Sequence, residues 1–370
     1  MSPRHLPVIA LSLAFSLTGA TAQQSGSSRI ERWDRNGDGK LSREEVPEPL
    51  RKNFDRVDKD GDGFVSKEED AAIGQGPGGG PGPSEGVKKL ADLDYAGTGN
   101  PRQTLDLYLP EKRVGSEPLP LIVFIHGGAW QGGDKNGGGA KVGAYVASGK
   151  YAGASIGYRL SGEAQWPSQI HDCKAAIRWL KAHAGEYGLD PDRIAVWGSS
   201  AGGHLVAMLG VSDGIEELEG KIGPHLDQNA KVHCVIDFFG SSELLTMGDH
   251  ESIIDHNAPD SPESKLVGGP ILENPDKAKS ASPIEHVTAD DAPHLIVHGD
   301  KDRVVPYPQS TDYKKRLASA GVPAILVTVA GGEHGKGFGP SVEKVVTAYL
   351  EKMLLGEEKE IADKTIPAGE

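Results

Sequence analysis

Two adjacent serines in the stretch IAVWGSSAGG (residues 194–203) are the first candidates for chemistry in this sequence. Apolar residues before them and the helix-forming HLVAML after them predict a strand, a sharp turn and a helix. A nucleophile elbow holds its serine at the tip of such a turn in the pattern G-x-S-x-G. Only Ser200 has the flanking glycines, Gly198 and Gly202, so we expect Ser200 rather than Ser199 to be the nucleophile. The alternative is a Gly-Ser turn with a structural role alone.

A serine nucleophile needs a base, and the base needs a carboxylate to hold its tautomer. Candidates for both follow later strands. Asp302 lies in KDRVVP after the strand LIVHGD, and His334 lies in EHGKG after the strand AILVTVAGG. We therefore predict His334 as the base and Asp302 as the acid, in the chain order Ser, Asp, His. Asp302 is preferred to Asp300 because Asp300 immediately ends its strand.

The negative charge that develops on an attacked carbonyl requires backbone N–H donors. One donor in such sites belongs to the residue after the nucleophile, here Ala201, and another to a loop after an earlier strand. The segment HGGAW (residues 126–130) supplies that loop, so Gly127 or Gly128 is the second predicted donor. We expect His126 to have a structural, hydrogen-bonding role.

The elements that must position these residues alternate between strand and helix. Apolar segments without polar alternation predict buried strands, and the segments between them have helical periodicity. This pattern predicts an α/β fold with a mostly parallel sheet covered on both faces, and a site at the carboxyl ends of its strands. The predicted strands are 93–96, 104–110, 119–128, 151–158, 193–198, 232–240, 293–300 and 323–331, and the main predicted helices are 169–182, 202–211, 310–320 and 341–355.

These motifs together carry a family resemblance. HGGAW, YRLS, QIHDCKAAIRWL, GLDPDRIAVWGSSAGGHL, SPI and HGDKDRVVP resemble α/β-hydrolase-fold carboxylesterases of the HGGG-type esterase and lipase group. The resemblance is closest to bacterial secreted feruloyl and acetyl-xylan esterases, and it spans about Lys88 to Leu355. It implies a serine esterase that acts on acyl groups of plant-type polysaccharides or similar small esters. Ala129 replaces the third glycine of HGGG, which a main-chain donor tolerates.

A second kind of chemistry is expected near the N-terminus, where DRNGDGKLSREE and DKDGDGFVSKEE both match the EF-hand loop. Oxygen ligands at these spacings suit Ca²⁺. The loops start 24 residues apart, so the segment Val46 to Val57 must serve as both exit and entry helix, which favours a compact, constitutively loaded unit over a sensor. The predicted ligands are Asp34, Asn36, Asp38, the Lys40 carbonyl and Glu45, and Asp58, Asp60, Asp62, the Phe64 carbonyl and Glu69.

The composition divides the chain into five segments. A basic start, an apolar stretch and the sequence ATA predict a signal peptide over residues 1–22, and hence a secreted or periplasmic protein. The EF-hand pair occupies 29–73, a Gly/Pro linker 74–86, the catalytic domain 87–356 and an acidic tail 357–370. A net charge of −14 argues against nucleic acid or an anionic membrane as a partner. The EF-hand pair is the candidate site for a protein partner.

Several alternatives stay open on the sequence. The same triad serves an amidase or peptidase, and closely spaced calcium loops also suit a binding or docking protein with an inert hydrolase domain. Cys173 and Cys234 fit either one disulfide or two buried thiols. We expect short or aromatic acyl groups on polar alcohols, no catalytic cofactor, and Trp130, Trp166 and Phe239 as candidate walls of the substrate pocket.

Overall fold

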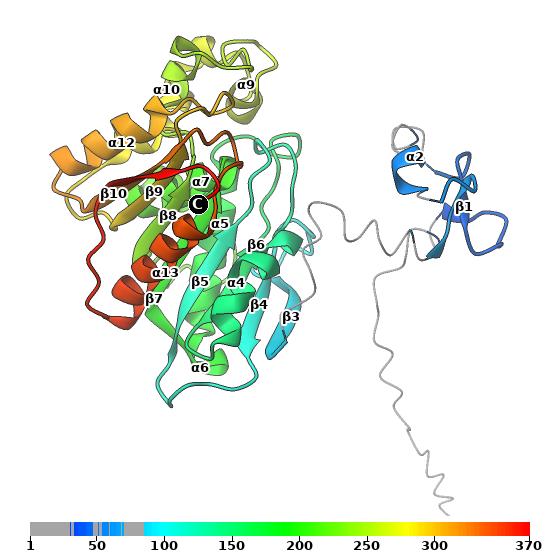
Figure 1. Cartoon of the computed structure of the whole chain (residues 1–370), viewed down its shortest axis with the longest axis horizontal. Coiled ribbons are helices and arrows are strands. Elements are labelled where there is room, and N and C mark those ends of the chain that lie inside the picture. Colours follow the sequence, from blue (N-terminus) through cyan, green and yellow to red (C-terminus); the bar gives the residue numbers. More distant parts are fainter. Residues whose placement is uncertain are drawn as a thin grey trace, which may run out of the picture. The chain divides into compact units, whose positions relative to one another are not determined.

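A computed structural model describes residues 30, 33–46, 51, 54–58, 60–67, 69 and 85–370. The chain divides into two compact units, residues 1–74 and 75–370, which we describe separately (Figure 1). The predicted signal peptide and nearly all of the Gly/Pro linker lie outside the described residues. None of the described helices is long and apolar enough to span a membrane.

The second unit is built on a nine-stranded sheet with the order β11-β10-β9-β8-β7-β5-β6-β4-β3. Neighbouring strands from β11 to β6 run parallel, and β4 pairs antiparallel with both β6 and β3. The central strands β5, β6 and β9 are mostly apolar and buried along their whole length, as a sheet covered on both faces requires. The strands are β3 (Val87–Asp94), β4 (Thr104–Pro110), β5 (Leu119–Ile125), β6 (Ala152–Ile156), β7 (Leu189–Ser199), β8 (Cys234–Phe238), β9 (His294–Gly299), β10 (Ala324–Ala330) and β11 (Lys364–Pro367).

Helices cover both faces of this sheet (Figure 1). Along β7, Ile194 and Val196 pack into one core with α5 and α7, whereas Ala195 and Trp197 pack into the other with α4 and α13. The alternation follows from the two-residue period of a strand. The helices are α4 (Gly138–Ala147), α5 (Ser168–Ala182), α6 (Ala184–Tyr187), α7 (Ala201–Val211), α8 (Glu216–Glu219), α9 (Pro262–Val267), α10 (Pro275–Ser280), α11 (Pro283–His286), α12 (Pro308–Ser319) and α13 (Pro340–Leu355), with 3₁₀ turns η2 (Lys135–Gly137), η3 (Leu244–Asp249) and η4 (Ile271–Glu273).

Two features at the edges of the sheet differ from the sequence prediction. Residues 357–370, expected to be a separate acidic tail, contain β11, which pairs with β10 in parallel and buries Ile366. Charged residues around this short strand hide its pattern. At the opposite edge, the strand predicted at 93–96 begins earlier, at Val87, and pairs with β4. Lys88 and Lys89 hide its start, since an edge strand is half-exposed and tolerates charged side chains. The catalytic domain therefore includes the C-terminal segment.

Cys173 and Cys234 are both free and buried. Cys173 packs into the core beneath α5 and α7, and Cys234 into the core on the other face of the sheet. The sheet separates the two thiols, so the structure has buried thiols in place of the alternative disulfide.

The first unit is small. Its strands β1 (Leu41–Ser42) and β2 (Phe64–Val65) pair antiparallel, one from each predicted calcium loop. Ile30, Leu41, Val46, Phe54 and Val65 form its described core. The predicted shared helix is described as a bend at Val46 and a short helix α2 (Phe54–Val57), with residues 47–50 and 52–53 outside the described part.

Candidate active site and calcium loops

Ser200 lies between the end of β7 and the start of α7, at the turn that the sequence predicts. Its backbone has φ 56° and ψ −124°, a strained conformation for a residue other than glycine, which costs about 1–3 kcal/mol. A Cβ on Gly198 would lie 2.1 Å from the carbonyl oxygen of Gly202, and a Cβ on Gly202 would lie 2.1 Å from that of Ile125. Both positions of the G-x-S-x-G pattern therefore require glycine.

The structure brings the three predicted triad residues together. His334 Nε2 lies 3.1 Å from Ser200 Oγ, and His334 Nδ1 lies 2.7 Å from Asp302 Oδ2. With Nδ1–H donating to the carboxylate, Nε2 is the acceptor for the serine hydroxyl, which is the tautomer that a general base needs. Ser200, Asp302 and His334 follow β7, β9 and β10, three parallel strands whose carboxyl ends meet at one edge of the sheet.

Asp302 is held at both carboxylate oxygens. Its Oδ1 accepts the N–H groups of Val304 and Val305 at 2.8 and 2.9 Å, and its Oδ2 faces His334 and, at 3.2 Å, His298 Nε2. Burial alone would raise its pKa, but the hydrogen bonds from His298 and His334 outweigh burial and hold the pKa of Asp302 well below its usual range. Asp302 is therefore a carboxylate throughout the neutral range.

The competing acid has another role. Asp300 Oδ1 accepts the N–H of Gly331 at 2.7 Å and so links the loop after β9 to the end of β10. Since Asp302 contacts His334 and Asp300 bonds this backbone, the geometry agrees with the preference for Asp302.

Sequence reasoning missed His298. This fully buried histidine of β9 has Nδ1 2.7 Å from Ser310 Oγ, and its Nε2 lies near Asp302 and 3.0 Å from the Val305 carbonyl oxygen. It ties the acid to the start of α12. Its signal in the sequence is a histidine directly after the apolar run Leu295–Val297, because a buried imidazole requires polar partners.

The predicted oxyanion-hole loop lies against the elbow. A Cβ on Gly127 would lie 3.3 Å from Ser200 Cβ, so the loop after β5 passes directly beside the serine. Within residues 85–370, the N–H groups of Gly127, Gly128 and Ala201 have no hydrogen-bond acceptor. They are therefore available to a substrate oxygen. Ala129, at the position of the third glycine, has φ 55°, a left-handed conformation that glycine would adopt more easily.

His126 has the structural role expected of it. Its ring stacks on Tyr158 with centroids 4.3 Å apart, and its Nδ1–H donates to the Gly127 carbonyl at 2.8 Å. Burial lowers the pKa of His126 to about 4, so the ring is neutral at neutral pH.

Of the three candidate pocket walls, only Phe239 borders the triad. Its ring centroid lies 4.7 Å from that of His334. Trp130 and Trp166 are buried in the core, where their indole N–H groups donate to His204 Nδ1 and Ser280 Oγ. Their prediction as pocket walls is corrected, because these indoles pack inside the unit.

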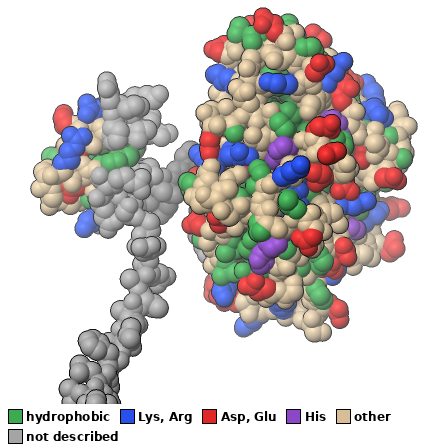
Figure 2. All heavy atoms as spheres, turned by 180° about the vertical axis from the view of Figure 1, so that it is seen from behind, with side chains coloured by type: hydrophobic (Ala, Val, Ile, Leu, Met, Phe, Trp, Pro, Cys, Tyr) green, Lys and Arg blue, Asp and Glu red, His purple; other side chains and the backbone are tan. Residues whose placement is uncertain are grey.

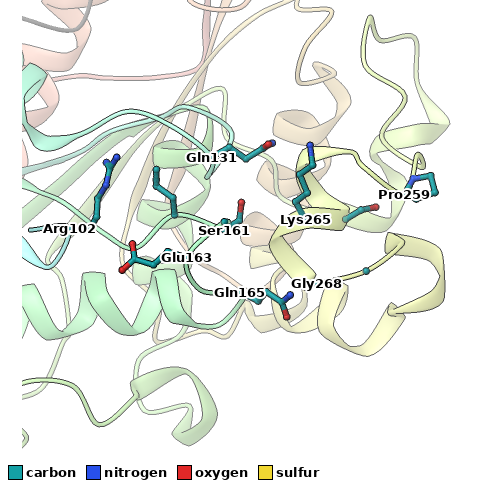
Figure 3. A pocket seen from close by; sticks show the side chains of 12 residues that line it. Arg102, Gln131, Ser161, Glu163, Gln165, Pro259, Lys265 and Gly268 are labelled. Atoms are coloured by element: carbon teal, nitrogen blue, oxygen red, sulfur yellow. The ribbon is translucent and has the colours of Figure 1, made fainter. Parts of the chain in front are cut away.

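A cavity of about 680 Å³ lies beside the oxyanion-hole loop, and we call it the polar cleft. Figure 3 shows its side chains, which come from the segment before β4, the turn after the oxyanion-hole loop, the loop after β6 and α9. The polar side chains that define it are Arg102, Gln131, Ser161, Glu163, Gln165 and Lys265.

The two calcium loops have matching internal bonds. In each loop the first aspartate accepts two backbone N–H groups: Asp34 from Gly37 and Gly39, and Asp58 from Gly61 and Gly63. Gly39 and Gly63 have φ 81° and 86°, the left-handed conformation that the sixth position requires. These bonds hold the two loops in the same turn conformation.

The last loop position also meets the requirement for a hard cation. Hydrogen bonds from the N–H and hydroxyl of Ser42 lower the pKa of Glu45 to about 2, so this ligand is ionised. In the second loop, Asp58, Asp60 and Glu69 offer carboxylate oxygens within 4.8 Å of one another. All-oxygen donor sets of this kind fit Ca²⁺.

Fold and site together define an α/β-hydrolase: an elbow serine, a histidine and an aspartate at the strand ends of a mostly parallel sheet. The BD-FAE family model matches residues 105–317, more than half of the chain, and the chain belongs to this family. The EF-hand model matches residues 31–46 and 50–69, so the first unit is an EF-hand pair.

Individual relatives agree with the family. The chain is 30% identical over 237 residues to "Esterase LipC" of Mycobacterium tuberculosis, an alignment that covers 64% of this chain and 57% of LipC. The chain thus spans little more than half the length of this curated relative. The solved structure "Truncated form of carbohydrate esterase from gut microbiota" has a TM-score of 0.69 and 35% identity, and covers 74% of this chain and 100% of its own. "Bifunctional GH43-CE Bacteroides eggerthii" has a TM-score of 0.66 and 30% identity, and the match covers 72% of this chain and 35% of that structure's chain.

Proposed function

We propose that this protein is a secreted serine carboxylesterase that hydrolyses short or aromatic acyl esters of carbohydrates. The observation that carries the proposal is the continuous contact from Asp302 through His334 to Ser200, beside unpaired backbone N–H groups. The names of two relatives, an esterase and a carbohydrate esterase, support the same activity.

The geometry supports a two-step acyl transfer. His334 Nε2 takes the proton of Ser200 as Oγ attacks the ester carbonyl, and the N–H groups of Ala201, Gly127 and Gly128 stabilise the oxyanion. His334 then returns the proton to the leaving alcohol, which leaves an acyl-serine. A water molecule, deprotonated by His334, then attacks the acyl-serine; the acyl C–Oγ bond breaks, His334 returns the proton to Ser200 Oγ, and the acid is released. Asp302 stabilises the imidazolium form in both steps.

The substrate preference rests on the surroundings of the triad. The aromatic ring beside the triad is that of Phe239, which is itself buried against His334, and the polar cleft offers hydrogen bonds to a hydroxyl-rich alcohol. Secretion rests on the N-terminal sequence of residues 1–22 alone.

Calcium has a separate place in this proposal. The residues that would hold it are the carboxylates Asp34, Asp38, Glu45, Asp58, Asp60, Asp62 and Glu69, the Asn36 amide and the Lys40 and Phe64 carbonyls. When bound, the cation would neutralise the clustered carboxylates and stabilise the EF-hand pair. Proton transfer is the work of His334, so we propose a structural or attachment role for this unit, including binding of a protein partner.

One assay tests the function directly. Purified protein is expected to hydrolyse 4-nitrophenyl acetate, and to hydrolyse it faster than the long-chain 4-nitrophenyl palmitate. Activity toward the matching anilide but not the ester would identify an amidase or peptidase instead. Absence of turnover of both substrates by folded protein would favour a binding protein with an inert hydrolase domain.

A further inference from the structure

A buried histidine, His204, connects the two segments that carry the oxyanion donors. Acidic and basic side chains are interspersed over the face of the second unit that Figure 2 shows, where water surrounds them. His204 on α7 is fully buried instead, and burial lowers the pKa of its ring to about 4, so the ring is neutral at neutral pH. A neutral imidazole offers one N–H donor and one acceptor, and both are used here.

The two ring nitrogens of His204 have different partners. Nδ1 accepts the indole N–H of Trp130 at 3.1 Å, and Nε2–H donates to the Ala281 carbonyl at 2.7 Å. An indole N–H can only donate and a carbonyl oxygen can only accept, so the two bonds fix one tautomer of the ring. The Trp130 and His204 rings also meet edge to face, with centroids 5.1 Å apart.

Trp130 belongs to a strained part of the oxyanion-hole loop. Gly128, Ala129 and Trp130 have φ of 114°, 55° and 55°, a conformation that is unfavourable for the two residues other than glycine. Such strain persists only where surrounding contacts over-determine the backbone. The indole bond to His204 and a 2.7 Å bond from the Ser161 N–H to the Trp130 carbonyl provide such contacts. If the indole bond is lost, the turn can relax, and the N–H donors of the loop move with it.

The backbone of His204 is fixed to the nucleophile elbow. Its N–H donates to the Ser200 carbonyl at 2.9 Å, in the first turn of α7. Ala201, whose N–H is the other predicted oxyanion donor, lies in the same turn. An oxyanion needs its donors at roughly 2.7–3.1 Å, so the loop after β5 and α7 must keep a fixed separation. His204 links these two segments through one side chain.

We propose that His204 is a positioning residue for ester hydrolysis, which holds the oxyanion-hole loop at a fixed distance from α7 through the Trp130 indole. The donors of the loop and of α7 then face one oxyanion together. The inference rests on the proposed esterase function, because the oxyanion belongs to that reaction. The effect falls on kcat rather than on KM, since the oxyanion is absent from the bound ester and forms only as the reaction proceeds.

Two substitutions separate the two bonds of His204. Asparagine places an amide oxygen near the position of Nδ1 and can accept the Trp130 N–H, whereas glutamine places its amide near Nε2 and can bond Ala281 instead. We expect His204→Gln to lower kcat for 4-nitrophenyl acetate by roughly 10²-fold, with KM within about threefold of the wild type, and His204→Asn to lower kcat less than roughly tenfold. A role in packing alone gives the reverse order, because asparagine leaves the larger cavity.

His294→Gln is the matched control. His294 is also fully buried, burial lowers its pKa to about 4, and its ring nitrogens bond Ala292 and Tyr313. It is the first residue of β9, at the opposite end of that strand from Asp302. This variant should lose stability to urea but keep its kcat. The thionoester analogue of the substrate adds a second readout: its sulfur accepts hydrogen bonds weakly, so His204→Gln should slow its turnover less than that of the ester.

Trp130→Phe keeps a ring and removes the donor, so it tests the same bond even if His204→Gln does not fold. It should lower kcat by a similar factor, and His204→Gln should add little in that background. The proposal is wrong if His204→Asn is more damaging than His204→Gln, if His294→Gln loses as much kcat, or if the Trp130 and His204 effects are independent. Normal wild-type turnover with unchanged kcat in these variants contradicts this inference alone, whereas absent wild-type turnover contradicts the proposed function.

Discussion

The two units use carboxylates in opposite ways. In the hydrolase unit, Asp302 is buried and bonded by two histidines and two backbone N–H groups, so its position is set by packing and needs no ligand. In the EF-hand pair, Asp60 and Asp62 are exposed, and Asp58, Asp60 and Glu69 gather their carboxylate oxygens within 4.8 Å of one another. The comparison teaches that one site is preorganised by the fold, whereas the other has the donors that a bound cation would complete.

The largest expected effect is at the preorganised site. Ser200→Ala should reduce kcat/KM for 4-nitrophenyl acetate by about 10⁵ to 10⁶, because it removes the attacking atom. Ser199→Ala is the matched control one residue away, and it should retain most of the activity. Equal losses in the two variants would contradict the assignment of the nucleophile.

The base and the acid come next. His334→Ala should be about as damaging as loss of the serine, and Asp302→Asn should lower kcat by roughly 10⁴, since the amide favours the wrong imidazole tautomer. Asp300→Asn keeps a side-chain oxygen for the Gly331 N–H and should have a small effect. If Asp300→Asn were the worse of the two, the acid would be misassigned.

A stability measurement extends the comparison of carboxylates to Asp237, a buried carboxyl group of the hydrolase unit for which a single hydrogen bond is found. Asp237 is buried on β8 and accepts one N–H, from Gly240, and burial raises its pKa from 3.8 to about 7. Below its unfolded pKa the group is neutral in both states. As pH rises toward 7, the unfolded state loses the proton first, so the free energy of unfolding decreases.

In the wild type, the free energy of unfolding should therefore fall by roughly 4 kcal/mol between about pH 4 and pH 7 because of Asp237. Asp237→Asn should abolish this fall. Urea unfolding followed by tryptophan fluorescence at several pH values measures this, with the exposed Asp290→Asn as control. An unchanged pH dependence in Asp237→Asn would show that Asp237 is ionised in the folded protein.

The smallest expected effect on activity comes from the EF-hand pair. Chelation of calcium should make residues 29–73 sensitive to protease, because the clustered carboxylates then repel one another, while turnover of 4-nitrophenyl acetate stays nearly unchanged. A fragment starting at Val87 should retain that turnover. A large loss of activity in the folded fragment would mean that the first unit contributes to the active site.

Much of the site could be predicted because its chemistry requires particular residues at short spacing. Gly198 and Gly202 are required by contacts under 3 Å, so the elbow leaves a local signature in the sequence. His298 leaves a weaker signature, since its partner Ser310 is on the following helix and only the folded chain brings them together. The sequence cannot tell whether Trp130 and Trp166 face a pocket or the core, because a tryptophan in a loop segment has the same local pattern in both cases; in the structure both lie in the core.

The sequence by itself determined the order of strands and helices, the EF-hand loops and the elbow, because each depends on neighbours within about a dozen residues. The tertiary structure decided what depends on distant pairings. It made β11 part of the sheet through Ile366, placed the two thiols on opposite faces, and brought the Asp302 carboxylate to His334. It also assembled the polar cleft, whose lining includes both Arg102 and Lys265 although 163 residues separate them in the sequence, since packing of the sheet and α9 brings their segments to one cavity and no local pattern encodes it.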